Sequence, residues 1–395
     1  MGGVDNISLL KLRVTYGLSG NDDIGNYNGD RYYHPYALVG QFGLVRTSLV
    51  NTELKPETMT RLGTGVDLSM YKERLNVSLD LYANTVSDMV MSVKPASISG
   101  SQYNVLLNAG KMRNLGLDLN LNARLVNTQD WKWDLGLMAS TYKNEVLDLG
   151  GQTYENEMWG GTVQTKVGQP LGVFYGYQTD GVFSTSDEAT AANLNIREGL
   201  VLIPFTAGDM RFVNQNSDNV IDASDRVVIG DPNPDLVGNI NTVLTYKQIA
   251  LSALFTYSVG GDVYNVARTQ LESMSTPNNQ FRTVLGRWRY EGDETSVPKA
   301  TPGDPMGNAR FSDRWIEDGS YLRLKNVTLS YNVPMNIPVI QNCSLYLSGE
   351  NLITLTRYKG LDPEFAAGTS PLYQGIDPCT VPQPRLLSLG IKLGL

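Results

Sequence analysis

Residues 112–126 read MRNLGLDLNLNARLV and show the strictest alternation in the chain. Every second position from Leu115 to Leu125 is apolar, and glycine, aspartate, asparagine or arginine fills the positions between. A helix would distribute these leucines around its surface, whereas a strand collects them on one face. The stretch therefore predicts a strand with one apolar and one polar face.

The same period of two recurs along the chain and predicts an all-β fold. Ten strands follow from it, at 7–17, 60–72, 74–86, 112–126, 131–145, 236–246, 249–258, 320–333, 343–353 and 383–395. Residues 34–46 fit either a strand or a loop. Strands of this length exceed the ~5–6 residues usual in globular sheets and match the ~9–11 residues that a tilted membrane-spanning strand needs.

The connections between these strands alternate in length. Short turns are predicted near Lys72-Glu73, at 127–130, at 247–248 and at 334–341, and long loops at 87–111, 146–235, 259–319 and 354–382. Short turns at one end and long loops at the other are typical of an antiparallel transmembrane β-barrel. A soluble or surface β-sandwich that binds carbohydrate with calcium is the alternative, because the strands of a sandwich alternate in the same way.

Composition argues against several classes of function. The 395 residues carry 32 Lys and Arg against 40 Asp and Glu, and the net charge of −8 argues against nucleic acid as a partner. His34 is the only histidine, so a His-based triad or a multi-histidine metal site is not expected. No carboxylate pair has a spacing that indicates catalysis. We therefore expect no enzyme activity and no required cofactor.

One segment has the spacing of a calcium-binding loop. The oxygen-ligand positions one, three, five, seven, nine and twelve fall on Asn214, Asn216, Asp218, Val220, Asp222 and Asp225. Asn219 stands where such loops usually have glycine, and Asp225 stands where they have a bidentate glutamate, so reach and charge are reduced. Two interpretations stay open: a weak Ca²⁺ site, and a metal-free loop of Asx turns.

Several longer motifs resemble a known family. Residues 108–119, NAGKMRNLGLDL, resemble a strand entry of SusC/RagA-type TonB-linked outer-membrane proteins, which are TonB-dependent receptors. Five further stretches are similar to motifs of that family, in its order: GQPLGVFYGY at 168–177, GDPNPD at 230–235, RWIEDGSYLRLKN at 314–326, GLDPE at 360–364 and PQPR at 382–385.

The resemblance implies that residues 1–395 are the C-terminal portion of a large antiparallel transmembrane barrel of about 22 strands, with the plug and N-terminal domains absent. We then expect the predicted strands to be too few to close a pore alone. The long loops would be extracellular, and residues 262–290 read as a partly helical loop that either contacts a lid or packs on itself.

The family also implies a function and a set of partners. The function is import of glycan fragments or peptides across the cell outer membrane of a Gram-negative, Bacteroidetes-type bacterium. The expected partners are a SusD-like lipoprotein on the extracellular loops, the TonB complex through the missing N-terminal part, an oligosaccharide or peptide ligand, and outer-membrane lipid.

Overall fold

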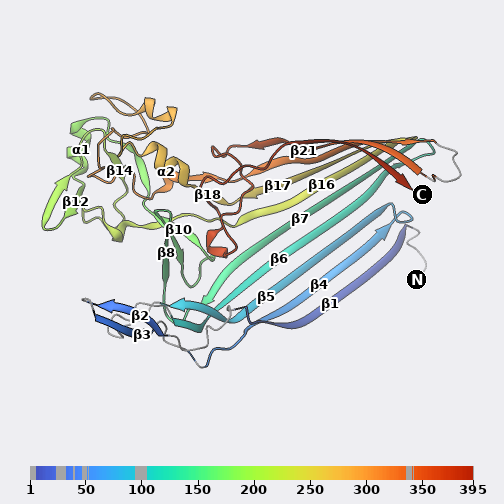
Figure 1. The fold of residues 1–395 in the computed structure, drawn as a ribbon, viewed down its shortest axis with the longest axis horizontal. Helices are drawn as coiled ribbons and strands as arrows, with labels where there is room; N and C mark the ends of the chain where they lie inside the picture. Colours follow the sequence, from blue (N-terminus) through green and yellow to red (C-terminus); the bar gives the residue numbers. More distant parts are fainter. Residues whose placement is uncertain are drawn as a thin grey trace. The chain divides into compact units, whose positions relative to one another are not determined.

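The computed structural model describes residues 6–23, 33–38, 41–46, 51, 53–93, 105–334, 340 and 342–394. Ten long strands are hydrogen-bonded in chain order, β1-β4-β5-β6-β7-β16-β17-β20-β21-β23 (Figure 1). Their bounds are β1 (Ile7–Asn21), β4 (Glu57–Met70), β5 (Leu75–Val93), β6 (Val105–Asn127), β7 (Trp131–Asp148), β16 (Pro234–Tyr246), β17 (Ile249–Gly260), β20 (Tyr321–Val333), β21 (Asn342–Thr356) and β23 (Leu386–Gly394). All ten predicted strands are thus confirmed, with shifted ends; Leu395 lies outside the described residues.

The loop predicted at 87–111 is wrong over most of its length. β5 continues to Val93 and β6 begins at Val105, while residues 94–104 lie outside the described part of the chain. The register shifts between Val86 and Met89, and Asp88 has a φ of 56°. A β-bulge of this kind adds a residue to one strand and breaks the alternation, so the period of two ends there although the pairing does not.

The ambiguous segment 34–46 forms two strands rather than one. β2 (Tyr33–Leu38) and β3 (Gln41–Arg46) pair with each other and form a sheet of their own. They belong to the long connection 22–56 between β1 and β4, which the alternation of loop lengths had not assigned.

The predicted alternation of short and long connections is otherwise confirmed. Short turns join β4 to β5, β6 to β7 and β16 to β17, and longer segments join β7 to β16, β17 to β20 and β21 to β23. In the first short turn, Tyr71, Lys72 and Glu73 all have positive φ. Of the turn predicted at 334–341, residues 335–339 and 341 lie outside the described residues.

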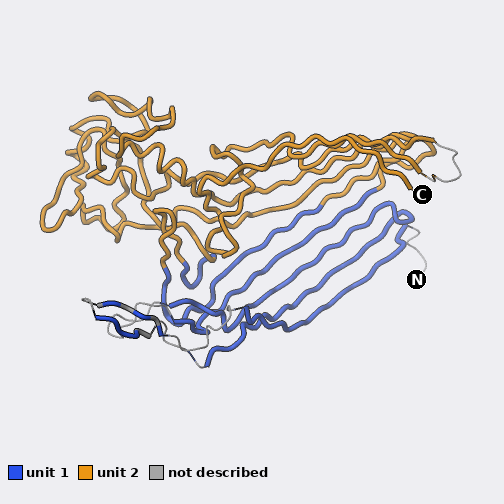
Figure 2. Tube along the Cα trace, in the orientation of Figure 1, with its two compact units in different colours: residues 1–123, 138–154, 165–170 blue, residues 124–137, 155–164, 171–395 orange. Residues whose placement is uncertain are grey.

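The chain divides into two compact units (Figure 2). Unit 1 comprises residues 1–123, 138–154 and 165–170, and unit 2 comprises residues 124–137, 155–164 and 171–395. In unit 1, the strand register places apolar residues opposite one another in the row Leu12, Val66, Leu79 and Leu119. The register next to this row brings charged residues together: Arg13 lies 2.9 Å from carboxylate oxygens of both Asp67 and Asp80. One face of the strands is therefore apolar and the other polar.

Unit 2 repeats the two-faced pattern. An apolar row crosses its strands at Leu244, Leu251, Leu329, Leu347 and Leu389. The neighbouring positions Ser252, Thr328, Ser348 and Ser388 form a polar row on the other face. Leu389 is 82% exposed and the other leucines of the row are exposed too. A β-sandwich would bury such a row against a second sheet, and among the described residues no second sheet covers it.

The long connections contain short elements of their own. These are β8 (Tyr154–Met158), β9 (Gly161–Thr165), β10 (Val173–Gly176), β11 (Thr179–Val182), α1 (Ser186–Ala192), β12 (Asn195–Glu198), β13 (Val201–Pro204), β14 (Met210–Phe212), η2 (Ala223–Asp225), β15 (Val227–Gly230), β18 (Asp262–Asn265), α2 (Val266–Glu272), η3 (Arg282–Gly286), η4 (Asp313–Trp315), β19 (Ile316–Asp318), η5 (Pro371–Tyr373) and β22 (Ile376–Asp377). α2 and η3 confirm the partly helical character predicted for 262–290. Within the described ranges, no helix has the length and apolar character needed to cross a membrane.

Candidate functional site

Three long connections of unit 2 form one body, which we call the loop assembly. The connection from β7 to β16 contributes residues 155–164 and 171–233, the connection from β17 to β20 contributes 261–320, and the connection from β21 to β23 contributes 357–385. β18 pairs with β19 on one side and, in parallel, with β22 on the other. A parallel bridge also joins Tyr177 to Ser312. Segments more than 100 residues apart along the sequence therefore share backbone hydrogen bonds, and Figure 1 shows α1, α2, β12 and β14 gathered in this part of the chain.

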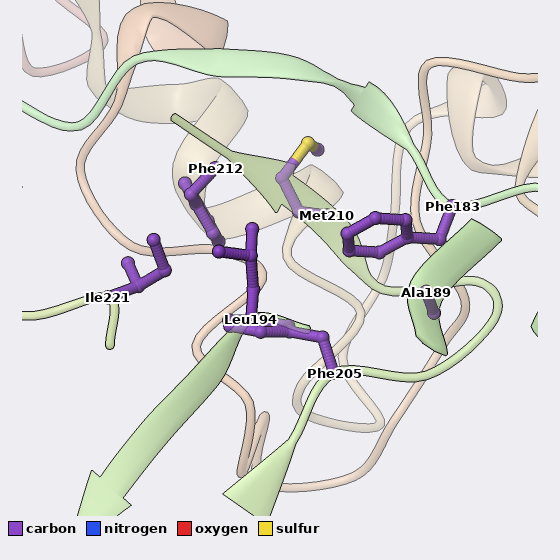
Figure 3. Packing of buried hydrophobic residues seen from close by; sticks show 7 residues of the cluster. All are labelled: Phe183, Ala189, Leu194, Phe205, Met210, Phe212 and Ile221. Carbon is purple, nitrogen blue, oxygen red and sulfur yellow. The ribbon is translucent and has the colours of Figure 1, made fainter. Parts of the chain in front are cut away.

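A first hydrophobic cluster holds the part of the loop assembly around α1 (Figure 3). It consists of Phe183, Ala189, Leu194, Phe205, Met210, Phe212 and Ile221, whose labelled side chains converge in the figure. α1 is short, and it begins where the Thr185 side chain accepts a hydrogen bond from the backbone N–H of Glu188. It ends at Asn193, which has a left-handed φ of 51°. Caps at both ends fix the turn that delivers Ala189 and Leu194 to the cluster.

A second cluster includes residues from two of the motifs that carried the family resemblance. Phe174 of GQPLGVFYGY and Trp315 of RWIEDGSYLRLKN are both fully buried there, with Tyr264 and Ile376. The Trp315 indole N–H donates to the carbonyl of Arg310 at 3.0 Å, and the Tyr264 hydroxyl donates to the carbonyl of Trp159 at 2.9 Å. Two of the motifs therefore contribute to this second core of the loop assembly, and the polar atoms of the buried Trp315 and Tyr264 side chains are both hydrogen-bonded.

A buried ion network lies beside Trp315. Arg268 of α2 donates to Glu272 at 3.0 Å and to Glu317 of β19 at 2.7 Å. Burial raises the pKa of Glu272, but hydrogen bonds and charge attraction from Arg268 outweigh it, so the pKa lies below its ordinary value. Burial likewise disfavours the charge on Arg268, and the two carboxylates overcome it and raise its pKa. The pair is therefore ionised and ties α2 to β19.

A second set of charges ties the last loop to the start of β20. Arg323 is paired with Asp362, and Lys325 lies 3.0 Å from a carboxylate oxygen of Glu364. Asp362 also accepts the backbone N–H groups of Glu364 and Gln383, at 2.9 and 3.0 Å. The motifs at 314–326, 360–364 and 382–385 thus meet at one carboxylate. All three motifs are recognisable in the sequence, but no sequence pattern indicates that they lie together in the folded protein.

The predicted calcium segment is a tightly hydrogen-bonded turn. Asn214, Asn216, Asp218 and Asp222 each accept a backbone N–H from a residue two or three positions later. Asp225 is fully buried and accepts the N–H groups of Gln215 and Asp222, at 2.8 and 2.9 Å. Val220 is buried, and Asn219, which stands where calcium loops usually have glycine, has a left-handed φ of 64°.

These hydrogen bonds are those of the Asx-turn interpretation, and calcium binding stays a prediction. Among the described residues, no three carboxylate, imidazole or thiol groups are placed to hold a metal ion. Amide and backbone carbonyl oxygens would have to complete a calcium site in this segment.

A cavity of about 410 Å³ opens in the loop assembly next to β18. Its walls include Pro232, Asp262, Tyr321, Phe365 and Tyr373. The Asp262 carboxylate accepts the backbone N–H of Asp231 at 2.8 Å. Burial raises the pKa of Asp262, and the nearby carboxylates of Asp231 and Asp318 raise it further, against that hydrogen bond. The cavity therefore has aromatic walls and a carboxyl group that resists ionisation.

Long strands with a bare apolar face, short turns at one end and a folded loop assembly at the other define this chain as part of a large antiparallel β-barrel of the outer-membrane type. The chain belongs to the family described as TonB dependent receptor-like, beta-barrel, whose model matches residues 4–352. The β-sandwich alternative is therefore wrong.

Relatives of known name agree with the resemblance to SusC and RagA. The chain is 31% identical over 400 residues to TonB-dependent receptor P26 of Formosa agariphila, covering 97% of this chain and 40% of the relative. It is 25% identical over 421 residues to TonB-dependent receptor SusC of Bacteroides thetaiotaomicron, covering 99% of this chain and 38% of the relative. The chain thus spans about two fifths of the length of the curated relatives it matches.

Solved structures give the same answer. The chain matches a structure of the RagAB peptide transporter with a TM-score of 0.80 and 25% identity, over 99% of this chain and 41% of that one. It matches the RagAB peptide importer in the closed-closed state with a TM-score of 0.81, at the same identity and coverage.

Proposed function

We propose that this chain supplies the C-terminal part of the barrel of a TonB-dependent importer in the outer membrane of a Bacteroidetes-type cell. The cargo is a glycan fragment or a peptide, and a SusD-like lipoprotein binds the loop assembly from outside. The TonB complex acts through an N-terminal part outside this sequence. The observation that carries the proposal is the exposed apolar row of unit 2, which lies on the face opposite a polar row. Lipid can cover such an apolar face, because the backbone groups of the strands are already hydrogen-bonded to neighbouring strands and none is left unpaired in the membrane.

Two further observations support an orientation in which the loop assembly is extracellular and the short turns are periplasmic. At the short-turn end of unit 2, the rings of Trp131 and Tyr246 lie against each other at a tilt of 35°, with centroids 4.4 Å apart, and aromatic residues at this level are typical of the girdles at a membrane interface. The loop assembly occupies the long connections, and in this class long loops are extracellular and short turns periplasmic.

Labelling of intact cells tests the orientation. In a chain carrying Cys343→Ser and Cys379→Ser, we introduce Leu200→Cys at the fully exposed residue between β12 and β13. The matched control is Gln129→Cys, in the exposed turn between β6 and β7. A membrane-impermeant maleimide should label the Leu200 variant on intact cells, and the Gln129 variant only after the outer membrane is opened. Equal labelling of both on intact cells contradicts the proposal.

Growth tests the import function. Cells without the protein should lose growth on one polysaccharide or on a peptide mixture as the sole nutrient, while growth on the matching monosaccharides or amino acids is unchanged. Re-expression of the complete protein with its natural flanking sequence should restore growth. Co-purification of a surface lipoprotein with the re-expressed protein tests the partner. Unchanged growth on every polymer and on peptides contradicts an import role.

A further inference from the structure

The cavity of about 410 Å³ next to β18 borders the polar face of the long strands. Ser258 of β17 and Tyr321 of β20 both line it, and they are paired in the strand register. Ser258 is separated from Ser252 of the polar row by an even number of positions, so the two side chains point to the same face of β17. In the proposed barrel that polar face lines the lumen. The cavity therefore borders the path of an imported ligand.

A second wall of the cavity comes from residues 363–375, in the connection from β21 to β23. This segment contributes the rings of Phe365 and Tyr373 and the side-chain amide of Gln374. The Gln374 Nε2 atom donates to the carbonyl of Pro232 at 3.1 Å, which ties the segment to the start of β16. The volume lies in the ~300–1,000 Å³ range of small-ligand sites.

Asp262 brings to this cavity a negative charge that the fold does not compensate. Its carboxylate accepts the backbone N–H of Asp231 at 2.8 Å, and none of the ion pairs among the described residues includes it. The charges that act on it are the carboxylates of Asp231, Asp318 and Asp235, and together with burial they raise its pKa. An asparagine could accept the same N–H without that repulsion. The charge of Asp262 therefore does not serve the fold of the loop assembly.

Two oxygen atoms of the cavity are left for a ligand. The Asp262 Oδ1 atom and the Tyr321 hydroxyl have no hydrogen-bond partner among the described residues, and neither atom is enclosed by protein. The other carboxylate of the cavity, Glu364, is already neutralised, because Lys325 lies 3.0 Å and Arg323 3.3 Å from its oxygens. Asp262 is thus the acceptor that lacks donors, and Tyr321 can both donate and accept.

This combination of groups suits a sugar. A pyranose has hydroxyl groups at its rim, which both donate and accept hydrogen bonds, and C–H groups on its faces, which pack on aromatic rings. The uncompensated charge of Asp262 disfavours an anionic ligand. An extended peptide would bind by adding a strand to a free sheet edge. No such edge borders the cavity within the described residues, because β17, β18 and β20 are each paired on both sides.

We propose that this cavity binds a neutral sugar unit of the imported ligand. Asp262 accepts a hydrogen bond from one sugar hydroxyl, and Tyr321 donates its hydroxyl proton to another sugar oxygen. The rings of Phe365 and Tyr373 cover apolar C–H groups of the sugar. The cargo is then a glycan fragment and not a peptide. This inference rests on the proposed import function, because it specifies the substrate class of that importer.

Binding of defined probes tests the site, in the complete detergent-solubilised protein with its natural flanking sequence. The sugar probes are the neutral oligosaccharides maltotriose, cellotriose, mannotriose, galactotriose, xylotriose, arabinotriose and kestose. The peptide probe is trialanine with an acetylated N-terminus and an amidated C-terminus, so that it is also uncharged. Isothermal titration calorimetry should detect binding of at least one oligosaccharide with a Kd below about 1 mM, and no binding of the peptide at that concentration.

Substitutions of Asp262 and Tyr321 place the binding in this cavity. Asp262→Asn keeps the acceptor for the Asp231 N–H but removes the charge, so it should weaken oligosaccharide binding about tenfold while the thermal midpoint does not fall. Tyr321→Phe removes a hydroxyl without a partner among the described residues and should also weaken binding, by about three- to tenfold.

Matched controls make the same chemical changes outside the cavity. Asp187→Asn in α1 and Tyr290→Phe both alter exposed side chains of the loop assembly that do not line the cavity, and both should leave binding unchanged. If Asp262→Asn does not fold, Tyr321→Phe and its control decide the question alone.

The outcomes separate this inference from the import function. Binding of no oligosaccharide, or binding that both cavity variants leave unchanged, overturns the sugar site. Peptide binding that these variants weaken also overturns it, because the cavity then takes a peptide. In each of these cases the growth experiment can still support import. Oligosaccharide binding that a cavity variant weakens, in cells whose growth on every polymer and on peptides is independent of the protein, supports the sugar site and contradicts the proposed import.

Discussion

Trp315 connects the hydrophobic and the charged parts of the loop assembly. Its ring is fully buried in the second cluster, and its N–H donates to the carbonyl of Arg310. The guanidinium groups of Arg268 and Arg314 lie 5.7 and 4.3 Å from its ring centroid. One side chain thus contributes apolar burial, a hydrogen bond and two cation–π contacts.

Trp315→Ala should destabilise the loop assembly by about 3–5 kcal/mol, the usual cost of truncating a buried tryptophan. The measurement is the rate of proteolysis within residues 171–320 of the protein in outer-membrane preparations. The control is Trp159→Ala, because Trp159 is 43% exposed and should change the rate little. Equal rates for the two variants would show that Trp315 is not part of the core.

Asp262 gives the loop assembly a pH dependence of known sign. Its folded pKa is raised by burial and by neighbouring carboxylates. The protonated form is therefore favoured in the folded state, and stability is lost as the pH rises through the folded pKa. Asparagine in its place keeps an oxygen that accepts the N–H of Asp231 and removes the charge.

Asp262→Asn should raise the thermal midpoint of the loop assembly at neutral pH, by an amount corresponding to less than about 1 kcal/mol because the group is only partly buried. The gain should shrink as the pH falls through the raised pKa of Asp262 toward the ordinary aspartate value of about 3.9, because the folded wild-type carboxyl then becomes protonated. Glu294→Gln, at an exposed position, is the control and should show no such trend. A gain that is independent of pH contradicts the raised pKa.

The segment 214–225, the predicted calcium segment, holds its own turn together by hydrogen bonds. Its side-chain oxygens already accept backbone N–H groups, and Asp225 alone satisfies two of them. The capping box between Asp222 and Asp225 fixes η2, and the segment as a whole delivers Ile221 to the first cluster. Calcium would therefore have to displace some of these hydrogen bonds or use the remaining lone pairs of these oxygens.

If the segment binds calcium, the metal should slow proteolysis within residues 214–225 of the wild-type protein and have no effect on Asp218→Ala. The physical reason is that Asp218 supplies a carboxylate at the fifth ligand position. Asp225→Asn is a useful second variant, since it should loosen the turn in calcium and in chelator alike, at about 1–3 kcal/mol for a buried N–H left unpaired. No effect of calcium on the wild type would retire the metal site.

The order of the paired strands determines whether the chain can form a closed barrel by itself. β1 and β23 stand at the two ends of that order among the described residues, and each pairs on one side only. Within lipid, an unpaired strand edge leaves backbone donors and acceptors without partners. Large outer-membrane transporters close their barrels with about 22 strands.

Residues 1–395 purified alone should therefore give no stable single-channel conductance in planar bilayers, because the strand edges have nothing to close against. The control is the longer protein with its natural flanking sequence, in which the plug expected from the family would block the lumen and deletion of that plug should open it. Steady, reproducible conductance from residues 1–395 alone would contradict the prediction and indicate closure by association of copies.

Sequence alone predicted the strands and their two faces because alternation is a local property. Successive side chains of a strand point to opposite faces, so the leucines of 115–125 specify their face without knowledge of any neighbour. Connection lengths are equally local, and they predicted which ends carry the long loops. The sequence did not predict the bulge at Asp88, because the bulge interrupts the local period of two while the pairing of β5 with β6 continues.

The loop assembly could not be read in this way, because its contacts join residues that are close only after folding. Arg268 meets Glu317 across 49 positions and Arg323 meets Asp362 across 39, and no local pattern marks either pair. Arg314 lies in one of the quoted motifs, but the motif does not show that its Nη1 atom lacks a hydrogen-bond partner among the described residues. That follows from the burial of the side chain and from the ion pair between Arg268 and Glu272. Strand faces follow from the covalent geometry of the chain, whereas charge compensation follows from which distant groups the packed core leaves within reach.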